Sequence, residues 1–461
     1  MFNFSFKKVI FYGAILALAF GLRIFNYVDF PIGSETADES AWAFLGASLI
    51  QEGQPTSWSY FAPYYDQNYI YAEREGEASL VRPDLDHPPL FALLPGLAHT
   101  LKNNWQTFPS LKLIRLPMIL LGTINVGLLM ILAGRYFEKK RYVYLAGLIY
   151  GLAPTFVFGS RLVVAENLLI AWTLLALIIL ASEKLKYRWR LLVGVGVLAI
   201  LSKFSGVIVP ISILVYGLMS KDKKVSQAGA AGLGLGLLLF GLYGAFYNFG
   251  LFLAILLEQG ARDLGLATLH HRFFLHPGVV EKIFFDGWVF FGLLTSMFLV
   301  AGRNIKEGSN KFLSLSVFVV LNILFILATS GENTYHAWYD YMLYPLFVMA
   351  IVIFLKNIFE EKNYLLFGVG WIVMLPLFKV GLTHAGIYDE TPTLMMRVMM
   401  GLGFLPLLFS WTKFKKLSPK IIWLMIGMWL VASIGVILVF NQFFYWEMDN
   451  LFRWQWCAEF F

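Results

Sequence analysis

The sequence has very little cysteine and few charged residues. Cys457 is the only cysteine among 461 residues, so the chain forms no disulfide within itself and no cluster of thiolate metal ligands. Asp, Glu, Lys and Arg together make up 14% of the residues, against about 25% in soluble domains, while 59% of the residues are hydrophobic. This composition excludes an ordinary soluble domain and predicts an integral membrane protein.

Apolar runs of roughly 20 residues recur along the whole chain, and a helix of that length crosses the hydrocarbon core of a bilayer. We therefore expect an all-α membrane protein, a polytopic helical bundle that forms one transmembrane domain over residues 1–461. The first 25 residues have the basic start of a signal peptide, and Ala17–Ala19 is an alternative cleavage site. Because the apolar stretch continues past that site, we interpret the N-terminal segment as an uncleaved first transmembrane span.

The basic residues are grouped between the apolar runs, where they indicate orientation in the membrane and not nucleic-acid binding. Clusters that fit a cytoplasmic position are residues 7–8, 135–141, 183–190, 221–224, 303–311, 356–362 and 413–416. If all these clusters are cytoplasmic, the chain crosses the membrane twice between each cluster and the next. This gives about 13 transmembrane helices, with a cytoplasmic N-terminus and an external C-terminus. Two external loops are then long, residues 29–113 and 250–283. The short interval 191–220 predicts a hairpin of two helices that turns at Leu201–Gly206, and one long tilted helix is the alternative.

The first external loop is expected to contain helices that lie on the membrane surface. Trp42, Leu45 and Leu49 recur at helical spacing, which favours an amphipathic helix. A second apolar stretch, residues 86–101, begins with two prolines that are expected to start another helix.

Ionisable side chains are costly inside hydrocarbon, so those at the ends of spans are candidates for function. On this topology the candidates gather on the outer side: Asp38, Glu39, Asp86, His87, Arg161, Glu166, Lys203, His270, His271, His276, His336, Tyr339 and Asp340. The spacing of His270, His271 and His276 matches no standard metal site, so the metal-binding residues stay unknown.

The adjacent carboxylates Asp38 and Glu39 have two interpretations. In one, Asp38 caps the surface helix and Glu39 complements the helix dipole. In the other, one of them is a general base for an acceptor hydroxyl, or a ligand of a divalent metal ion. The two interpretations are compatible, because a capped Asp is held rigidly.

Arg161, Glu166 and Lys203 lie at the ends of later spans. Arg161 and Glu166 could pair with each other across a turn, and Lys203 could extend its ammonium to the membrane interface. Arg and Lys at such positions also suit a phosphate group, through fork geometry and point charge respectively.

The order of the motifs resembles a known family. The segments "ADESAWAFLGASLIQEGQP", "HPPLFALLPG", Arg115-Leu116-Pro117, "PTFVFGSRLVVAENLL", "LSKFSG" and "YDYMLYP" follow one another between residues 5 and 350. This series is similar to the integral-membrane glycosyltransferases of GT-C type, especially the bacterial relatives of protein O-mannosyltransferases and lipid A aminoarabinose transferases.

The resemblance implies a membrane glycosyltransferase that moves a hexose or pentose from a polyprenyl-phosphate donor to an acceptor hydroxyl outside the cytoplasmic membrane. It makes Asp38 the catalytic base, with Glu39 beside it, and Glu166 the second acidic residue. Arg161 and Lys203 match basic positions that face the donor phosphate.

The remaining candidate residues are expected to contact the substrates. The family's PPL segment usually follows Lys, and here it follows His87. We expect His87, His336 and Tyr339 to contact substrate, and Asp38, Glu166, Lys203 and His336 to converge on one cavity. No cofactor is expected to be required, although a divalent metal could assist. The acceptor is a protein, lipid or glycan, and a polytopic transporter or flippase of lipid-linked sugars is the alternative function.

Overall fold

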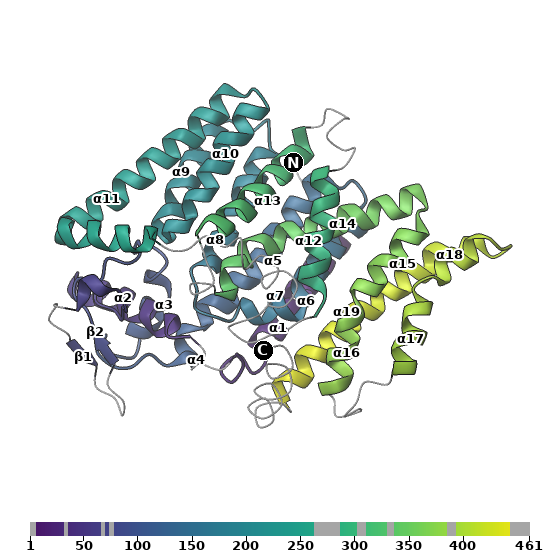
Figure 1. Ribbon diagram of the computed structural model, residues 1–461, viewed down its shortest axis with the longest axis horizontal. Helices are drawn as coiled ribbons and strands as arrows, with labels where there is room; N and C mark the ends of the chain where they lie inside the picture. Colours follow the sequence, from purple (N-terminus) through teal and green to yellow (C-terminus); the bar gives the residue numbers. More distant parts are fainter. Residues whose placement is uncertain are drawn as a thin grey trace.

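We describe the fold from a computed structural model, which describes residues 6–31, 36–65, 70–72, 78–261, 286–301, 310–329, 336–384 and 393–442. The described chain is almost entirely helical, as expected (Figure 1). Its one sheet in the described ranges is a two-stranded antiparallel hairpin, β1 (Ile70–Ala72) with β2 (Ala78–Leu80), in which Ile70 pairs with Leu80.

The helices of the first half are α1 (Phe6–Ile24), α2 (Asp38–Glu52), η1 (Ala62–Tyr64), α3 (Leu93–Thr100), α4 (Leu111–Ile114), α5 (Leu116–Tyr136), α6 (Lys140–Leu152), α7 (Pro154–Gly159), α8 (Glu166–Leu180), α9 (Arg188–Ser202), η2 (Phe204–Val207), α10 (Ile208–Met219) and α11 (Lys223–Gly260). Those of the second half are α12 (Trp288–Ala301), α13 (Asn310–Thr329), η6 (Ala337–Leu343), α14 (Tyr344–Glu361), α15 (Tyr364–Val373), α16 (Leu375–His384), α17 (Thr393–Leu402), α18 (Leu405–Ser410), η7 (Lys415–Leu417) and α19 (Ser418–Gln442).

Several of these helices can cross a membrane. Five helical stretches in the described ranges are long and apolar enough to do so: Leu111–Tyr136, Lys223–Gly260, Phe312–Thr329, Ala337–Glu361 and Lys415–Val439. Shorter apolar helices accompany them, including Val9–Ile24, which is the expected first span. The chain is therefore a multi-pass helical membrane protein, and the count of about 13 spans stays a prediction.

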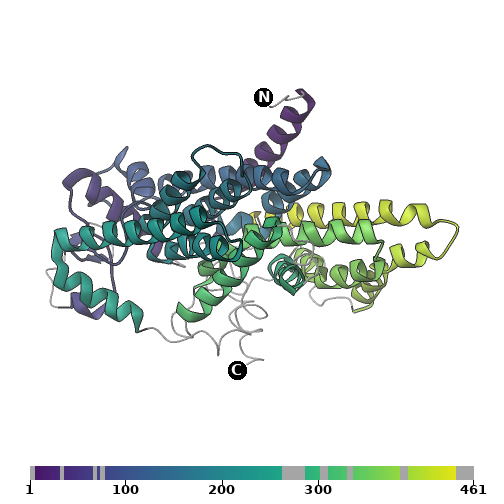
Figure 2. The ribbon, with the colours of Figure 1, turned by 90° about the horizontal axis from the view of Figure 1, so that it is seen from above.

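The helical hairpin expected within residues 191–220 is present. Helices α9 and α10 are separate, and the chain turns between them at Lys203 and η2. Both helices pack along α11, which is consistent with the three adjacent ribbons in Figures 1 and 2. Gly206 allows the tight turn, because a Cβ atom on it would collide with the carbonyl oxygen of Ala199. The hairpin brings Lys203 to the end of the bundle where α2 and α3 lie.

A helix predicted from residues 42, 45 and 49 is present as α2. Its Trp42 and Leu45 are buried and Leu49 is partly buried, in one apolar cluster with the residues just before α3 and the start of α5. Residues 43, 44 and 46–48 are also buried, so α2 is not the expected amphipathic helix with an exposed polar face, and a position on the membrane surface stays a prediction. The expectation that the two prolines start the next helix is wrong: Pro88 and Pro89 precede a turn over residues 90–92, and α3 begins at Leu93.

Helix α11 bends sharply near its C-terminal end. Asn248 has non-helical φ and ψ angles, and its Oδ1 accepts a hydrogen bond of 3.1 Å from the backbone N–H of Leu251, as a helix cap does. The residues beyond the bend lie across the end of the bundle, above α2 in the view of Figure 1. The predicted external loop 250–283 is therefore helical as far as Gly260, and residues 262–285 lie outside the described part.

Helices α18 and α19 extend at the other end of the molecule from α2 and α3 in both views (Figures 1 and 2). Between the two ends, the main apolar core joins α1, α5, α6, α8 and α14, and the inner residues of α14 from Tyr344 to Val352 are all buried. This core gives the first loop and the α9–α10 turn a fixed support.

Candidate active site

A cavity of about 390 Å³ lies where residues 38–61 and 84–87, parts of the predicted first external loop, meet the ends of α8, α9 and α13. It is lined by Asp38, Ala41, Trp42, Leu45, Ser57, Trp58, Ser59, Tyr60, Phe61, Asp84, Asp86, His87, Glu166, Lys203, Phe204, Ser205, Leu256, Gln259, Gly260, Asn322, Phe325, Ile326, Ala328, Thr329, His336, Tyr339 and Met342. Its volume is within the range of small-molecule sites, about 300–1,000 Å³, and its lining combines apolar and ionisable groups. Asp38, Glu166, Lys203 and His336, from four separate segments, line this one cavity.

Asp38 is the first residue of α2, and its exposed fraction is intermediate. The prediction that Asp38 caps this helix is wrong. Ala37 occupies the cap position without a side-chain hydrogen bond, and the Thr36 hydroxyl accepts a 3.1 Å hydrogen bond from the Asp38 backbone N–H. Its carboxylate lies in the first turn of the helix, where the helix dipole interacts favourably with a negative charge.

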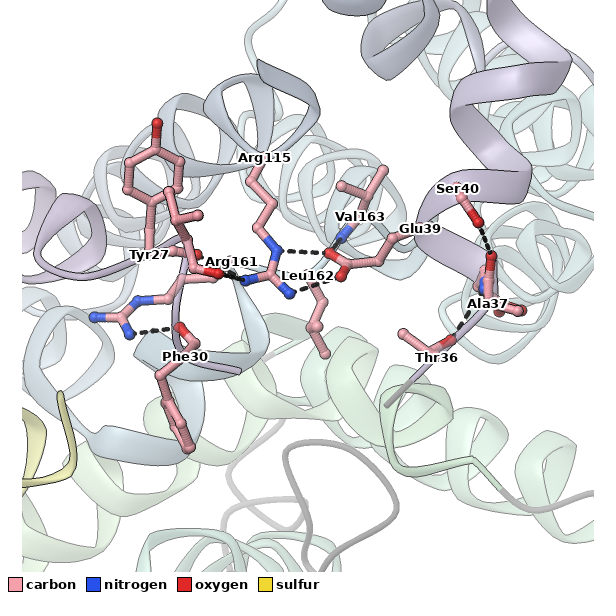
Figure 3. Close-up of polar contacts among 12 residues, drawn as sticks. Tyr27, Phe30, Thr36, Ala37, Glu39, Ser40, Arg115, Arg161, Leu162 and Val163 are labelled. Atoms are coloured by element: carbon pink, nitrogen blue, oxygen red, sulfur yellow. Dashed lines mark hydrogen bonds and ion pairs between the residues drawn. The ribbon is translucent and has the colours of Figure 1, made fainter. Parts of the chain in front are cut away.

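Glu39 is buried and is not among the residues that line the cavity, and its carboxylate points to Arg115 (Figure 3). Arg115 donates to both of its carboxylate oxygens, with an Nε to Oε1 distance of 2.9 Å and an Nη2 to Oε2 distance of 2.6 Å. The backbone N–H of Val163 donates to Oε1 at 2.9 Å. Glu39 lies in the first turn of α2, as expected of a residue that complements the helix dipole. The interpretation of Glu39 as a general base or a metal ligand is wrong, because the protein engages both oxygens and the side chain does not line the cavity.

Arg161 also lies outside the cavity lining, and its side chain is buried. Its guanidinium donates to the backbone carbonyl oxygens of four residues at 2.7–3.1 Å: Leu22, Arg23, Phe25 and Phe30. The suggested ion pair of Arg161 with Glu166 is wrong, because these carbonyl oxygens hold the Arg161 guanidinium and Glu166 pairs with Lys203 instead. Arg161 fixes the chain that follows α1, and this direction does not suit contact with a donor phosphate in the cavity.

Lys203 and Glu166 form a buried ion pair that faces the cavity. The Lys203 Nζ to Glu166 Oε1 distance is 2.6 Å. Burial lowers the pKa of Lys203, but the opposite charges of Glu166 and Asp38 outweigh it and raise the pKa above its ordinary value. Glu166 Oε2 is buried and has no hydrogen-bond partner among the described residues. This oxygen is a ready acceptor for a ligand hydroxyl.

Aromatic rings hold the remaining predicted contacts. Tyr339 lies beside Lys203, whose Nζ is 5.0 Å from the centre of the tyrosine ring. His336 stacks on Trp338 with ring centres 4.4 Å apart. His87 stacks on Trp42 at 4.6 Å. All three predicted contacts, His87, His336 and Tyr339, line the cavity, whereas His270, His271 and His276 lie outside the described residues.

Two features of the site were not expected from the sequence as functional. Arg115 was noted only as part of a family motif, and no pattern in the sequence pairs it with Glu39. Asp84 was not a candidate, although "DLDH" places two carboxylates two residues apart in one short loop, which could have indicated a polar side of a site. Asp84 is buried and lines the cavity, and this burial raises its pKa to about 6.

In the ranges that the structure describes, no group of three or more His, Cys, Asp or Glu side chains could hold a metal ion. Lys203 is the single Lys or Arg side chain among the described lining residues.

Part of the chain matches a known family, and the whole fold is similar to solved structures. Residues 86–243 match a family model described as dolichyl-phosphate-mannose-protein mannosyltransferase. No curated protein matches the sequence. Among solved structures, ArnT from Cupriavidus metallidurans bound to undecaprenyl phosphate is similar with a TM-score of 0.58 and 13% identity, over 97% of this chain and 78% of that one.

Two further structures are similar. The apo state of the same ArnT gives a TM-score of 0.50 and 14% identity, over 95% of this chain and 77% of that one. Arabinosyltransferase EmbB from Mycobacterium smegmatis gives 0.56 and 13% identity, over 95% of this chain and 42% of that one.

Proposed function

Because the chain has the GT-C type fold of membrane glycosyltransferases, we propose that it transfers a sugar from a polyprenyl-phosphate donor to an acceptor hydroxyl. The observation that carries the proposal is the cavity, where Asp38, Glu166, Lys203 and His336 converge from four segments of the chain. A carboxylate, a cation and a buried hydrogen-bond acceptor are the groups that this reaction needs. The transporter or flippase interpretation requires no such convergence of catalytic groups.

The proposed chemistry is a single inverting displacement. Asp38 removes the proton of the acceptor hydroxyl while that oxygen attacks the anomeric carbon, and the bond to the phosphate oxygen breaks. The leaving group is already a stable phosphate, so the enzyme mainly activates the acceptor and stabilises charge. Lys203 is assigned to the donor phosphate, because no other lysine or arginine lines the described cavity.

Glu166 is assigned two tasks in this proposal. Its Oε1 positions Lys203 through their ion pair. Its Oε2, which lacks a partner among the described residues, accepts a hydroxyl of the donor sugar. Glu39 is a positioning residue, because its bonds to Arg115 and Val163 fix the first turn of α2 and hence the direction of Asp38.

We further propose that the cavity opens on the outer face of the cytoplasmic membrane, with the N-terminus inside, as the basic clusters predict. No divalent metal is required in this proposal, because the donor carries its own leaving group. Activity that disappears after exhaustive chelation and returns with a metal ion would contradict this part.

Substitution of Asp38 tests the central assignment. The purified protein is supplied with radiolabelled undecaprenyl-phosphate sugar and an acceptor extract, and the release of free lipid phosphate is measured. We expect release only when acceptor is present, and a loss of at least about 100-fold in Asp38→Asn, since a general base contributes about 10²–10⁴.

The matched control is Glu361→Gln, which removes an exposed carboxylate at the end of α14 and should leave the rate unchanged. Full activity of Asp38→Asn would remove the assignment. Movement of intact donor across the membrane without release would favour a flippase.

A further inference from the structure

One side of the cavity is an aromatic wall, which we define as Trp58, Tyr60 and Phe61. The ring centres of Trp58 and Tyr60 are 5.7 Å apart and those of Tyr60 and Phe61 are 4.6 Å apart. Phe61 is buried in a small apolar cluster, whereas 53% of Tyr60 is exposed and Trp58 is partly exposed. All three residues line the cavity. The reaction proposed above uses none of them.

The aromatic wall is held in place at both ends. Before it, Ser57 exchanges backbone hydrogen bonds with Val81 at 3.3 and 2.8 Å, and the Ser57 hydroxyl donates to the carbonyl oxygen of Ala41 in α2. After it, the N–H of Ala62 donates to Glu258 at the end of α11. Large rings fixed beside a cavity and left partly uncovered are typical of preorganised recognition surfaces.

Polar groups complete this side of the cavity. Asp84, Asp86 and Gln259 line it together with the aromatic wall. Hydrogen bonds hold these residues: Tyr64 donates to the Asp86 carboxylate at 2.9 Å, Gln259 donates to the Asp86 carbonyl oxygen at 3.0 Å, and the Asp86 N–H donates to Asp84 Oδ1 at 3.0 Å. Carboxylates accept several hydrogen bonds from hydroxyl groups. Flat apolar faces next to such acceptors match a sugar ring, which has an apolar C–H face and an edge of hydroxyls.

We infer that the acceptor is a saccharide, whose ring stacks on Trp58 and Tyr60 and directs its hydroxyls to Asp84 and Asp86 while one hydroxyl reaches Asp38. This inference rests on the proposed transfer reaction and names its acceptor class. A lipid tail against this wall would bury two carboxylates without hydrogen-bonding partners from the ligand. An extended peptide is commonly bound through backbone hydrogen bonds to a strand edge, whereas this wall offers side chains.

Saccharide binding is measured by saturation-transfer NMR on the full chain. The chain is held in phospholipid nanodiscs, because maltoside detergents carry a sugar headgroup. The probes are methyl glycosides of glucose, galactose, mannose and arabinose, longer oligosaccharides of the sugar that binds, and a serine-rich peptide. We expect at least one glycoside to bind, and Trp58→Ala and Tyr60→Ala each to weaken it about tenfold, in the range of aromatic hot spots.

The matched control is Tyr65→Ala, which removes a tyrosine that is 69% exposed in the same loop and does not line the cavity. Undecaprenyl-phosphate binding is measured in parallel on every variant. Tighter binding of oligosaccharides indicates a glycan polymer as the acceptor, and equal binding of the monosaccharide indicates a single sugar, such as a glycolipid headgroup. Both results support the inference.

Binding of the peptide without any glycoside overturns the inference, and so does glycoside binding that Trp58→Ala and Tyr60→Ala leave unchanged. Failure of the unmodified protein to bind undecaprenyl phosphate contradicts the proposed function instead, so the two failures are distinguishable.

Discussion

At the scale of single residues, two neighbouring carboxylates have different surroundings. Asp38 lines the cavity, whereas Glu39 is buried against Arg115, because consecutive residues of a helix point about 100° apart. Removing one member of such a buried bidentate ion pair lowers the stability of the protein strongly, because the other charge stays buried without its counter-charge. In the proposed mechanism catalysis depends on Asp38, whereas the ion pair of Glu39 contributes to stability.

Loss of the Glu39 charge is expected to destabilise the protein strongly. Glu39→Gln leaves the buried Arg115 cation without its partner, and the free energy of unfolding should fall by about 3–5 kcal/mol. The double variant Glu39→Leu with Arg115→Met removes both charges and should recover most of that loss. Chemical denaturation of the purified variants measures this, and a double variant less stable than Glu39→Gln would contradict the account.

Asp84 should make stability depend on pH. Its pKa of about 6 in the folded protein lies above the unfolded value of about 3.8, so the folded state binds more protons between these values. The free energy of unfolding should therefore fall as pH rises from about 4 to about 6, by up to about 3 kcal/mol, and level off above that.

Asp84→Asn has no group that titrates at this position. The free energy of unfolding of the unmodified protein should therefore fall relative to that of Asp84→Asn as pH rises from about 4 to about 6. Denaturation at pH 4, 5, 6 and 7 measures it. A difference that is independent of pH would show that Asp84 has no raised pKa.

At the scale of elements, the α9–α10 hairpin determines where the cationic group of the site lies. Lys203 ends α9 in an extended conformation, and the following turn of η2 depends on Gly206 packing closely against Ala199. The sequence indicated the hairpin through its length and charges. The contact of Lys203 with Glu166 required the packing of α8 beside α9.

Substitution of Gly206 should therefore displace the Lys203 turn. In Gly206→Ala the new Cβ collides with the Ala199 carbonyl, so we expect lower stability and at least about a tenfold slower transfer. Gly194→Ala in the same hairpin is the control, because no atom lies within 4 Å of its Cβ position and alanine favours a helix. Similar transfer rates in the two variants would contradict the role of the turn.

At the scale of the whole molecule, the elements that form the cavity lie at one end of α9, α10 and α11 (Figure 1), while the basic residues that start α9 and α11 lie at the other. If the site lies on the outer face and the basic loops lie in the cytoplasm, the two must be at opposite ends of the helices, as they are. The side of the membrane on which each end lies is a proposal that labelling can test.

Cysteine labelling in intact cells should distinguish the two ends. A background with Cys457→Ser has no other cysteine, so single cysteines are introduced by Tyr65→Cys beside the cavity or Lys224→Cys at the start of α11. An impermeant maleimide should label Tyr65→Cys in intact cells and Lys224→Cys only after permeabilisation. The reverse pattern would invert the proposed topology.

The sequence by itself determined the class of fold and most residues of the candidate site. The length of the apolar runs and the cost of charge in hydrocarbon are local properties, so they predicted a multi-pass helical protein, the α9–α10 hairpin and polar groups at the ends of spans. The existence of helix α2, though not its burial on most sides, followed from residues 42, 45 and 49 for the same reason.

The tertiary structure alone decided which partner each charged group takes. Glu39 meets Arg115, Arg161 meets the carbonyl oxygens that follow α1, and Glu166 meets Lys203 and not Arg161. The members of each pair lie far apart in the sequence, and no periodicity connects them. Side-chain direction depends on how the helices pack, which is why Asp38 could be distinguished from Glu39 only in the folded chain.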